Sequence, residues 1–274
     1  MKKILIISVV LVTAAQAAGA FGFKWKSIPV NAERTGVTAP TATNVDAAVG
    51  TFDGKTYVAP NGVRFKKNTA TAKAARLMID AQPPMAELKE VLGYCPEGLS
   101  RRGIESTLGN WVVDCVMYET EKELGKKVDI GIMNHGGIRI DMPQGDVLKD
   151  DIMSMLPFNN HLCYLTMSGE NVLALFNSMA SYMQVVGGVK VTVKDGKVQE
   201  LLIGGKPVDP AGTYSIATID FLLDGGDDIF VARNSESLEM TEMLVYEAAM
   251  AYIRELKASG KNIEKEIENR VVEL

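Results

Sequence analysis

Histidine and cysteine, the usual nitrogen and sulfur ligands of transition metals, are scarce in this 274-residue sequence. The two histidines are His135 and His161, and the three cysteines, Cys95, Cys115 and Cys163, form no Cys-x-x-Cys pair. A structural zinc site needs about four such ligands, so the composition argues against a thiolate metal site. An odd cysteine count leaves at least one thiol free, and we expect Cys115 and Cys163 to be buried core residues.

Excess positive charge is lacking as well. The sequence has 29 Lys and Arg against 34 Asp and Glu, a net charge of −5. A protein that grips the phosphate backbone of nucleic acid needs a basic surface, so we expect no nucleic-acid partner. A small anionic ligand would need a local cluster of hydrogen-bond donors instead.

Beyond the first residues there is no apolar run long enough to span a membrane. The N-terminus itself has the pattern of a signal peptide: Lys2 and Lys3, an apolar run over 4–12, and small-x-small cleavage candidates within 15–20. No cysteine lies near these candidates to carry a lipid anchor. We predict that residues 1–20 are a signal peptide and that the mature protein is exported and soluble, in the periplasm or outside the cell.

Residues 21–85 have little periodicity and are interpreted as a leader or linker. Two short runs, 56–58 and 63–65, flank a Pro-Asn-Gly turn and predict a small hairpin. A helix is expected over 72–81. The Pro83-Pro84 pair should end it, with a second short helix following.

The remainder, 86–274, predicts one main domain of the α/β (α+β) class, a mixed β-sheet flanked by helices. Its elements follow from apolar periodicity and from capping and turn residues. The expected elements are a helix over 106–124, a buried strand over 128–133, a helix after Ser168, a hairpin over 190–203 turning at Asp195-Gly196, a strand over 213–219 and a helix over 241–258.

The Asn-His-Gly-Gly-Ile-Arg loop at 134–139 follows the buried strand. Adjacent glycines allow a ligand or another backbone to approach closely. Asn134 can donate or accept hydrogen bonds, and the guanidinium of Arg139 matches phosphate or carboxylate. A tight turn with Arg139 as a surface charge explains this loop, taken alone, equally well.

Two further segments carry an aromatic residue beside polar groups. Phe158 follows a proline and precedes two asparagines, and Phe221 precedes the Leu-Leu-Asp-Gly-Gly stretch that ends at Asp227. A nucleobase stacks on an exposed aromatic ring with about 1–3 kcal/mol, and a carboxylate can accept hydrogen bonds from two ribose hydroxyls. Taken alone, each phenylalanine is more simply a core residue.

In this order and spacing, the segments resemble the C-terminal, nucleotide-recognising domain of the 5'-nucleotidases, over about 86–274. The resemblance implies that Phe158 and Phe221 sandwich the nucleobase and that Asp227 holds the ribose hydroxyls. It also implies that Asn134 and Arg139 bind the sugar and phosphate end of the nucleotide.

Asn160 matches a family asparagine near the base in some members. One departure concerns the segment before the helix at 106–124. Related enzymes can carry an arginine directly before the glutamate of that segment, where this chain has Ile104. Arg101 or Arg102 is the candidate to replace it from the preceding turn.

Full-length family members also carry an N-terminal metallophosphoesterase domain whose two metals activate water. Its Asp-x-His and Gly-Asn-His/Asp motifs are missing here. We therefore assign no catalytic residue, metal ligand or cofactor to this chain, and expect a divalent metal only in a partner. The leading interpretation is the nucleotide-binding half of a hydrolase for nucleotide catabolism, working with a separately encoded metallophosphoesterase. A stand-alone nucleoside- or nucleotide-binding module, a structural protein with a vestigial pocket, and a different phosphorus or sulfur ester as substrate remain alternatives.

Overall fold

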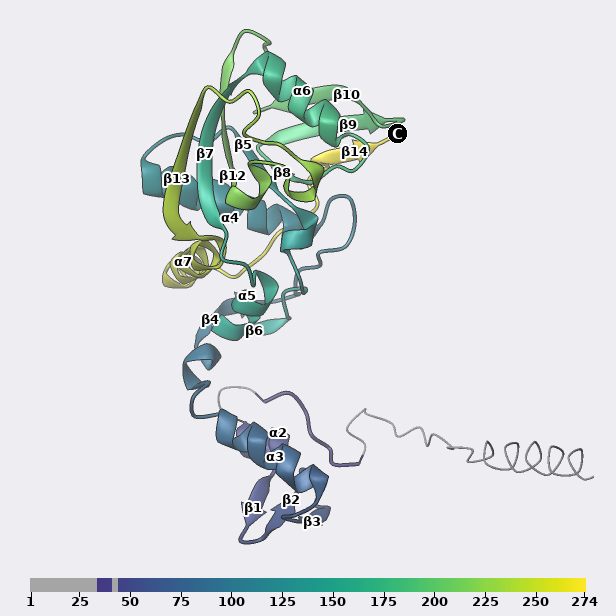
Figure 1. Ribbon diagram of the computed structural model, residues 1–274, viewed down its shortest axis with the longest axis vertical. Helices are drawn as coiled ribbons and strands as arrows, with labels where there is room; N and C mark the ends of the chain where they lie inside the picture. Colours follow the sequence, from purple (N-terminus) through teal and green to yellow (C-terminus); the bar gives the residue numbers. More distant parts are fainter. Residues whose placement is uncertain (1–33, 41–43) are drawn as a thin grey trace, which may run out of the picture. The chain divides into compact units, whose positions relative to one another are not determined.

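The computed structural model describes residues 34–40 and 44–274, and the chain divides into two compact units at residues 81 and 82. The predicted signal peptide lies outside the described residues. Figure 1 shows the helices and strands of both units. Each unit is described by itself.

The smaller unit contains the hairpin and the helix expected from the sequence, with one further strand and one further short helix. Strands β2 and β3 form that hairpin, and β1 adds a third antiparallel strand beside β2. Tyr57 is fully buried at the centre, and its hydroxyl donates a 2.6 Å hydrogen bond to the carbonyl of Val49. The elements are α2 (Val45–Val49), β1 (Thr51–Asp53), β2 (Thr56–Val58), β3 (Arg64–Lys66) and α3 (Ala70–Ala81).

The larger unit is built on a five-stranded sheet with the order β13-β7-β12-β5-β8. Only β12 and β5 run parallel within it, so the sheet is mixed, as the sequence predicts. The strands are β5 (Ile130–Met133), β7 (His161–Ser168), β8 (Val185–Gly187), β12 (Thr213–Ile219) and β13 (Ser237–Leu244).

Helix α4 (Thr107–Leu124) packs along this sheet and begins and ends at the residues expected from the sequence. The Ser106 hydroxyl accepts a hydrogen bond from the amide of Gly109 at 3.0 Å. Gly125 ends the helix in the left-handed conformation, with φ of 63°. Ser168 likewise caps α6 (Gly169–Met179), which packs on β7, β12 and β10.

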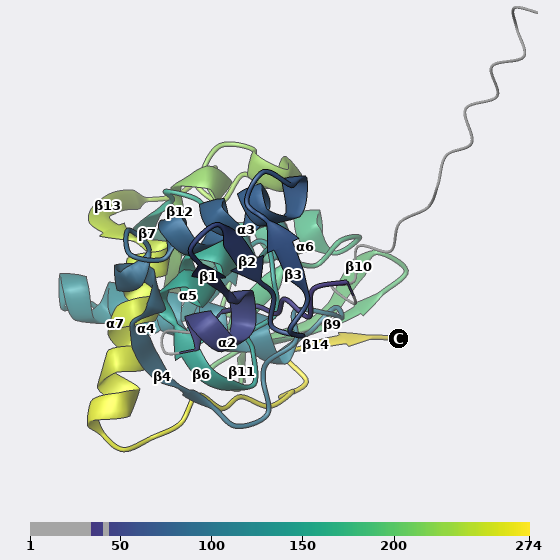
Figure 2. The ribbon, with the colours of Figure 1, turned by 90° about the horizontal axis from the view of Figure 1, so that it is seen from below.

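A second sheet, with the order β11-β10-β9-β14, contains the predicted hairpin. Figures 1 and 2 both show β9, β10 and β14 side by side. Asp195 and Gly196, at φ of 50° and 68°, make the turn. The strands are β9 (Val189–Lys194), β10 (Lys197–Ile203), β11 (Lys206–Pro207) and β14 (Val271–Glu273).

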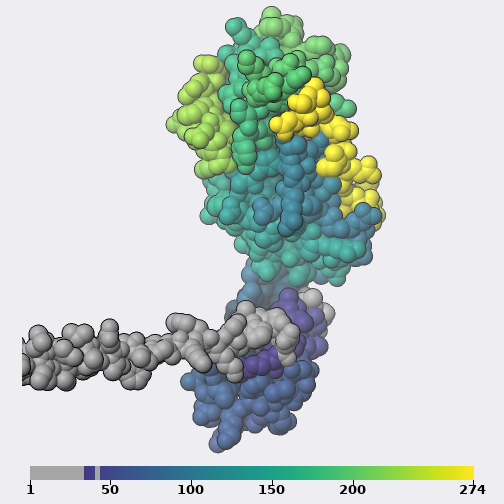
Figure 3. All heavy atoms as spheres, turned by 90° about the vertical axis from the view of Figure 1, so that its right-hand side faces the viewer, coloured from purple at the N-terminus to yellow at the C-terminus, as the bar shows by residue number. Residues whose placement is uncertain are grey.

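Polar contacts hold the C-terminal segment against α4. Arg270 is 5% exposed and makes a bidentate pair with Asp114 of α4, at 2.7 and 2.8 Å. The carboxylate of Glu105, just before α4, accepts hydrogen bonds from the amides of Glu268 and Arg270. Figure 3 shows these yellow C-terminal residues lying along the blue residues of this region.

The remaining elements form the end of the unit nearest the loop at 134–139. Strands β4 and β6 pair antiparallel, and α5 and α7 pack against each other. These elements are η1 (Ala86–Lys89), β4 (Val91–Cys95), β6 (Gly145–Leu148), α5 (Lys149–Met155) and α7 (Val245–Ala258).

The start of the last helix differs from the sequence expectation. Residues 241–244 belong to β13, which pairs with β7, and α7 begins only at Val245. The Glu247 carboxylate accepts a hydrogen bond from the amide of Leu244, which makes Leu244 the cap of the helix. The apolar spacing of residues 241–244 also suits a helix, but pairing with β7 makes them part of a strand.

The three cysteines are buried and none forms a disulfide. Cys115 and Cys163 are core residues, as predicted, and burial raises the pKa of Cys163 to about 12. The thiol of Cys163 is therefore protonated and unreactive at neutral pH. Within the described ranges, no helix is both long and apolar enough to cross a membrane.

Candidate functional site

A cavity of about 380 Å³ in the larger unit brings together all six residues that the sequence analysis selected. This volume lies within the range of small-molecule pockets, about 300–1,000 Å³. The binding roles of the six residues remain predictions. The lining residues are Asn134, Gly136, Gly137, Arg139, Phe158, Asn159, Asn160, Phe221 and Asp227.

Two exposed phenylalanines provide the apolar surface of the cavity. Phe158 is 47% and Phe221 is 45% exposed, although both are large apolar side chains. Pro157, which follows the end of α5, restricts the backbone before Phe158. Phe221 lies in η3 (Asp220–Leu222), directly after β12, and a Cβ on Gly226 would meet its ring at 2.7 Å. These exposed rings fit ligand contact better than core packing.

The loop after β5 positions the carboxylate of Asp227 at the cavity. Asn134 is 4% exposed, and its Nδ2 donates a 2.7 Å hydrogen bond to Oδ2 of Asp227. A Cβ on Gly137 would lie 2.6 Å from Oδ1 of Asn134, so a side chain at this position would displace the Asn134 amide. Asp227 itself has φ of 51°, a conformation that few non-glycine residues adopt. Asn134 therefore orients Asp227, a role that the sequence did not predict.

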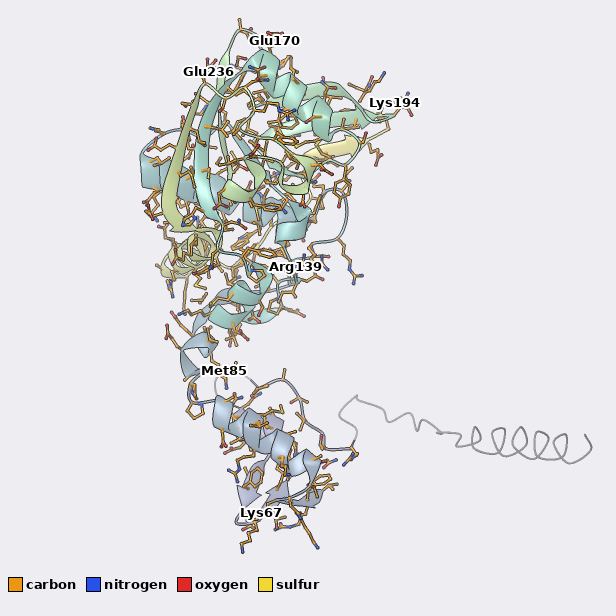
Figure 4. The ribbon with its side chains drawn as sticks, viewed as in Figure 1. Lys67, Met85, Arg139, Glu170, Lys194 and Glu236 are labelled. Carbon is orange, nitrogen blue, oxygen red and sulfur yellow. The ribbon has the colours of Figure 1, made fainter. Side chains whose placement is uncertain are left out.

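Arg139 is exposed and partly anchored beside Phe158. Its Nη1 donates to the carbonyl of Gly136 at 3.0 Å, and its backbone amide donates to the carbonyl of Met155 at 2.9 Å. Its Cζ lies 5.9 Å from the centroid of the Phe158 ring. Figure 4 shows Arg139 next to α5. The remaining guanidinium N–H groups can donate to an anion at this end of the cavity.

The carboxylate of Asp220, which the sequence motifs do not identify as a site residue, contacts Asn160 in the lining of the cavity. Oδ1 of Asp220 accepts a 2.7 Å hydrogen bond from Nδ2 of Asn160, and its Oδ2 lies 3.3 Å from Nδ1 of His161. Burial alone would raise the pKa of Asp220. Hydrogen bonds from Asn160 and from the backbone and side chain of His161 outweigh burial and lower that pKa below its usual value. The sequence signal that could have identified Asp220 is its place directly before Phe221, at the end of a predicted strand.

Arg101 and Ile104 lie away from this lining. They line a separate cavity of about 440 Å³ with His135 and Tyr182, whose rings meet edge-on with centroids 6.3 Å apart. Burial lowers the pKa of His135, so its imidazole is neutral at pH 7. The structure therefore does not bring Arg101 to the cavity that contains Arg139.

In the described part of the chain, no three or more His, Cys, Asp or Glu residues are grouped so that they could hold a metal ion. The aromatic rings of the cavity can stack on a ligand, and its polar groups can accept and donate hydrogen bonds. No step of water activation is assigned to them.

The comparisons with known proteins identify the family of this domain. The model of the 5'-nucleotidase C-terminal domain matches residues 84–233, more than half of the chain. The chain therefore belongs to the 5'-nucleotidase family through this domain. It is 30% identical to Protein UshA of Escherichia coli over 159 residues, which covers 56% of this chain and 28% of that protein. It is 36% identical to the 5'-nucleotidase of Vibrio cholerae over 108 residues, covering 37% and 19% of the two chains.

Solved structures give the same result. The 5'-nucleotidase precursor of Thermus thermophilus superposes with a TM-score of 0.64 at 27% identity, covering 74% of this chain and 43% of that one. The NAD nucleotidase of Haemophilus influenzae superposes with a TM-score of 0.58 at 15% identity, which is evidence of the shared fold alone. The matched region spans less than a third of the length of the curated relatives quoted above.

Proposed function

We propose that this chain is the nucleotide-recognition half of an exported 5'-nucleotidase-type hydrolase. The observation that carries the proposal is the pair of exposed rings, Phe158 and Phe221, on one cavity with Asp227 and Arg139. The rings would sandwich the base, Asp227 would accept hydrogen bonds from the ribose hydroxyls, and Arg139 would donate to the phosphate. Asn160 would contact the base edge.

Hydrolysis of the phosphate ester would require a metal centre from a separate metallophosphoesterase chain. The support is the lack of a metal-ligand cluster within the described residues. This chain would bind and orient the nucleotide, and the partner would supply the divalent metals that activate water.

Calorimetric titration of residues 21–274 with adenosine and AMP tests the binding half of the proposal. We expect micromolar affinity. The double variant Phe158→Ala, Phe221→Ala should weaken binding by at least about 30-fold, because each of the two base–aromatic stacks contributes about 1–3 kcal/mol. Phe230→Ala is the matched control, since Phe230 is also exposed but does not line the cavity. Wild-type protein that binds neither ligand would refute the proposal.

Phosphate release from AMP tests whether hydrolysis needs a separate metallophosphoesterase. With manganese or zinc, the pure chain should release almost no phosphate, and adding a metallophosphoesterase encoded beside it should start the reaction. Enzyme-like turnover by the pure chain would refute the need for a partner. Tight binding with no activity alongside any such partner would favour a stand-alone binding module.

A further inference from the structure

Asp220 connects two walls of the cavity. Its carboxylate accepts hydrogen bonds from the Asn160 side chain at 2.7 Å and from His161, and also from the backbone amide of Phe221. The backbone of Asn160 is anchored separately, because its carbonyl accepts a 3.0 Å hydrogen bond from the amide of Val245. The position of the Asn160 side chain is therefore determined by protein contacts before any ligand binds.

The carboxylate also decides which end of the Asn160 amide faces the cavity. An ionised carboxylate has only acceptor oxygens, so it can be satisfied only by the NH₂ end of the amide. The carbonyl oxygen Oδ1 must then point away from Asp220. No described residue donates a hydrogen bond to this oxygen, and Asn160 lines the cavity. The groups that Asn160 keeps for a ligand are the acceptor Oδ1 and the second N–H of Nδ2, and the bond to Asp220 fixes which of them lies where.

We infer that Asp220 is a positioning residue that makes this cavity select bases carrying an exocyclic amino group, namely adenine and cytosine, over their oxo counterparts. This inference rests on the proposed function, because it assigns the base preference of the same cavity. It concerns the orientation of one amide and requires no change in the position of either phenylalanine.

The selection follows from matching donors with acceptors. An amino group on the base donates a hydrogen bond to Oδ1 of Asn160. A carbonyl at the same ring position would bring two acceptors together with no hydrogen between them, while both lose water. Adenosine and inosine differ at this position, as do cytidine and uridine, and stacking on the rings is similar within each pair. We expect the amino member to bind about tenfold more tightly or better.

The test is a set of dissociation constants for adenosine, inosine, cytidine, uridine and purine riboside, which has no group at the amino position. Asp220→Asn keeps the shape but places an amide that can donate to Oδ1 of Asn160. The Asn160 NH₂ then faces the cavity, and the preference should fall to none or reverse. Asn160→Ala should remove the preference while purine riboside still binds. Asp224→Asn is the matched control, an exposed carboxylate that does not line the cavity and should leave the preference unchanged.

Each outcome decides the matter. Equal binding of amino and oxo nucleosides by the wild-type chain would overturn the inference. A preference that survives Asp220→Asn but disappears in Asn160→Ala would also overturn it, because the amide would then select the base without help from Asp220. A thermal unfolding scan shows whether the Asp220→Asn chain is folded. If it is not, Asp220→Ala takes its place, because loss of the carboxylate frees the Asn160 amide to turn and should also weaken the preference. Failure of all five nucleosides to bind would instead defeat the proposed function.

Discussion

At the residue scale, the cavity depends on side chains that fix other side chains. Asn134 orients Asp227, and Asp220 orients Asn160. The sequence predicts Asn134, Asn160 and Asp227 as ligand contacts, and all three line the cavity. It does not predict that Nδ2 of Asn134 donates to Asp227, or that Oδ1 of Asn134 is buried without a hydrogen-bond partner among the described residues. Sequence motifs name residue types, and only packing decides which atoms remain free.

Ribose recognition gives a prediction at this scale. Asp227→Gly removes the carboxylate, and glycine adopts the positive φ of 51° at this position without strain. Charge-assisted hydrogen bonds to two hydroxyls should be lost, so adenosine should bind about 10- to 100-fold more weakly. Binding of 2′,3′-dideoxyadenosine should not change. Calorimetry of both ligands measures this difference, and Asp228→Gly, at φ of 61° and outside the cavity lining, is the control. Equal losses for the two ligands would contradict the assignment.

At the element scale, the sequence predicts long, capped elements well. α4 begins after Ser106 and ends at Gly125, β12 spans 213–219 as expected, and the hairpin turns at Asp195-Gly196. These elements are defined by local apolar periodicity and by local caps and turns. The start of α7 and the strand β13 depend on pairing with β7, which is distant in sequence, so periodicity alone misplaces that boundary.

Helix α4 offers a pH-dependent prediction. Glu119 is 1% exposed, and burial raises its pKa above 4.5 despite Lys122 nearby. Folding therefore favours the protonated form. The contribution of Glu119 to stability is fully present below its unfolded-state pKa and is lost as the pH rises through the raised folded-state pKa.

Glu119→Gln should remove this pH dependence. We expect the free energy of unfolding to rise by about 1 kcal/mol at pH 7 and 8, and to change little at pH 4. Urea unfolding at these pH values measures the difference between the two chains. Glu121→Gln, on the same helix and more exposed, is the control. A variant that is destabilised at pH 7 and 8 but unchanged at pH 4 would show that the ion pair with Lys122 matters more than burial.

At the scale of the whole molecule, the chain contains two separate cores. One surrounds Tyr57 and belongs to the smaller unit, and the other lies wholly within the larger unit. The formal charges also differ: 7 Lys and Arg against 3 Asp and Glu over 34–81, and 18 against 30 over 82–274, which gives +4 and −12. The sequence predicts the hairpin and the helix of this unit but not α2 and β1, which are five and three residues long and too short to show periodicity.

Separate cores predict separate unfolding. Tyr57→Ala removes the largest buried side chain of the smaller unit, a change that costs about 3–5 kcal/mol, which a core of this size cannot absorb. We expect the smaller unit to unfold while adenosine affinity and the unfolding transition of 82–274 stay the same. Hydrogen exchange of both units, together with calorimetric titration, checks this. Loss of adenosine binding would show that the two units are coupled.

Local periodicity, turn chemistry and short motifs are enough to predict the family, the mixed α/β class, the capped helices and the six residues that line the cavity. Which atoms of those residues are free depends on tertiary contacts. Asp220 and Asn160 are 60 residues apart, and Asn134 and Asp227 are 93 residues apart. Hydrogen bonds over such separations form only when the sheet brings β5, β7 and β12 together. For that reason the sequence could indicate a nucleotide, while the donor and acceptor pattern that selects the base depends on the fold.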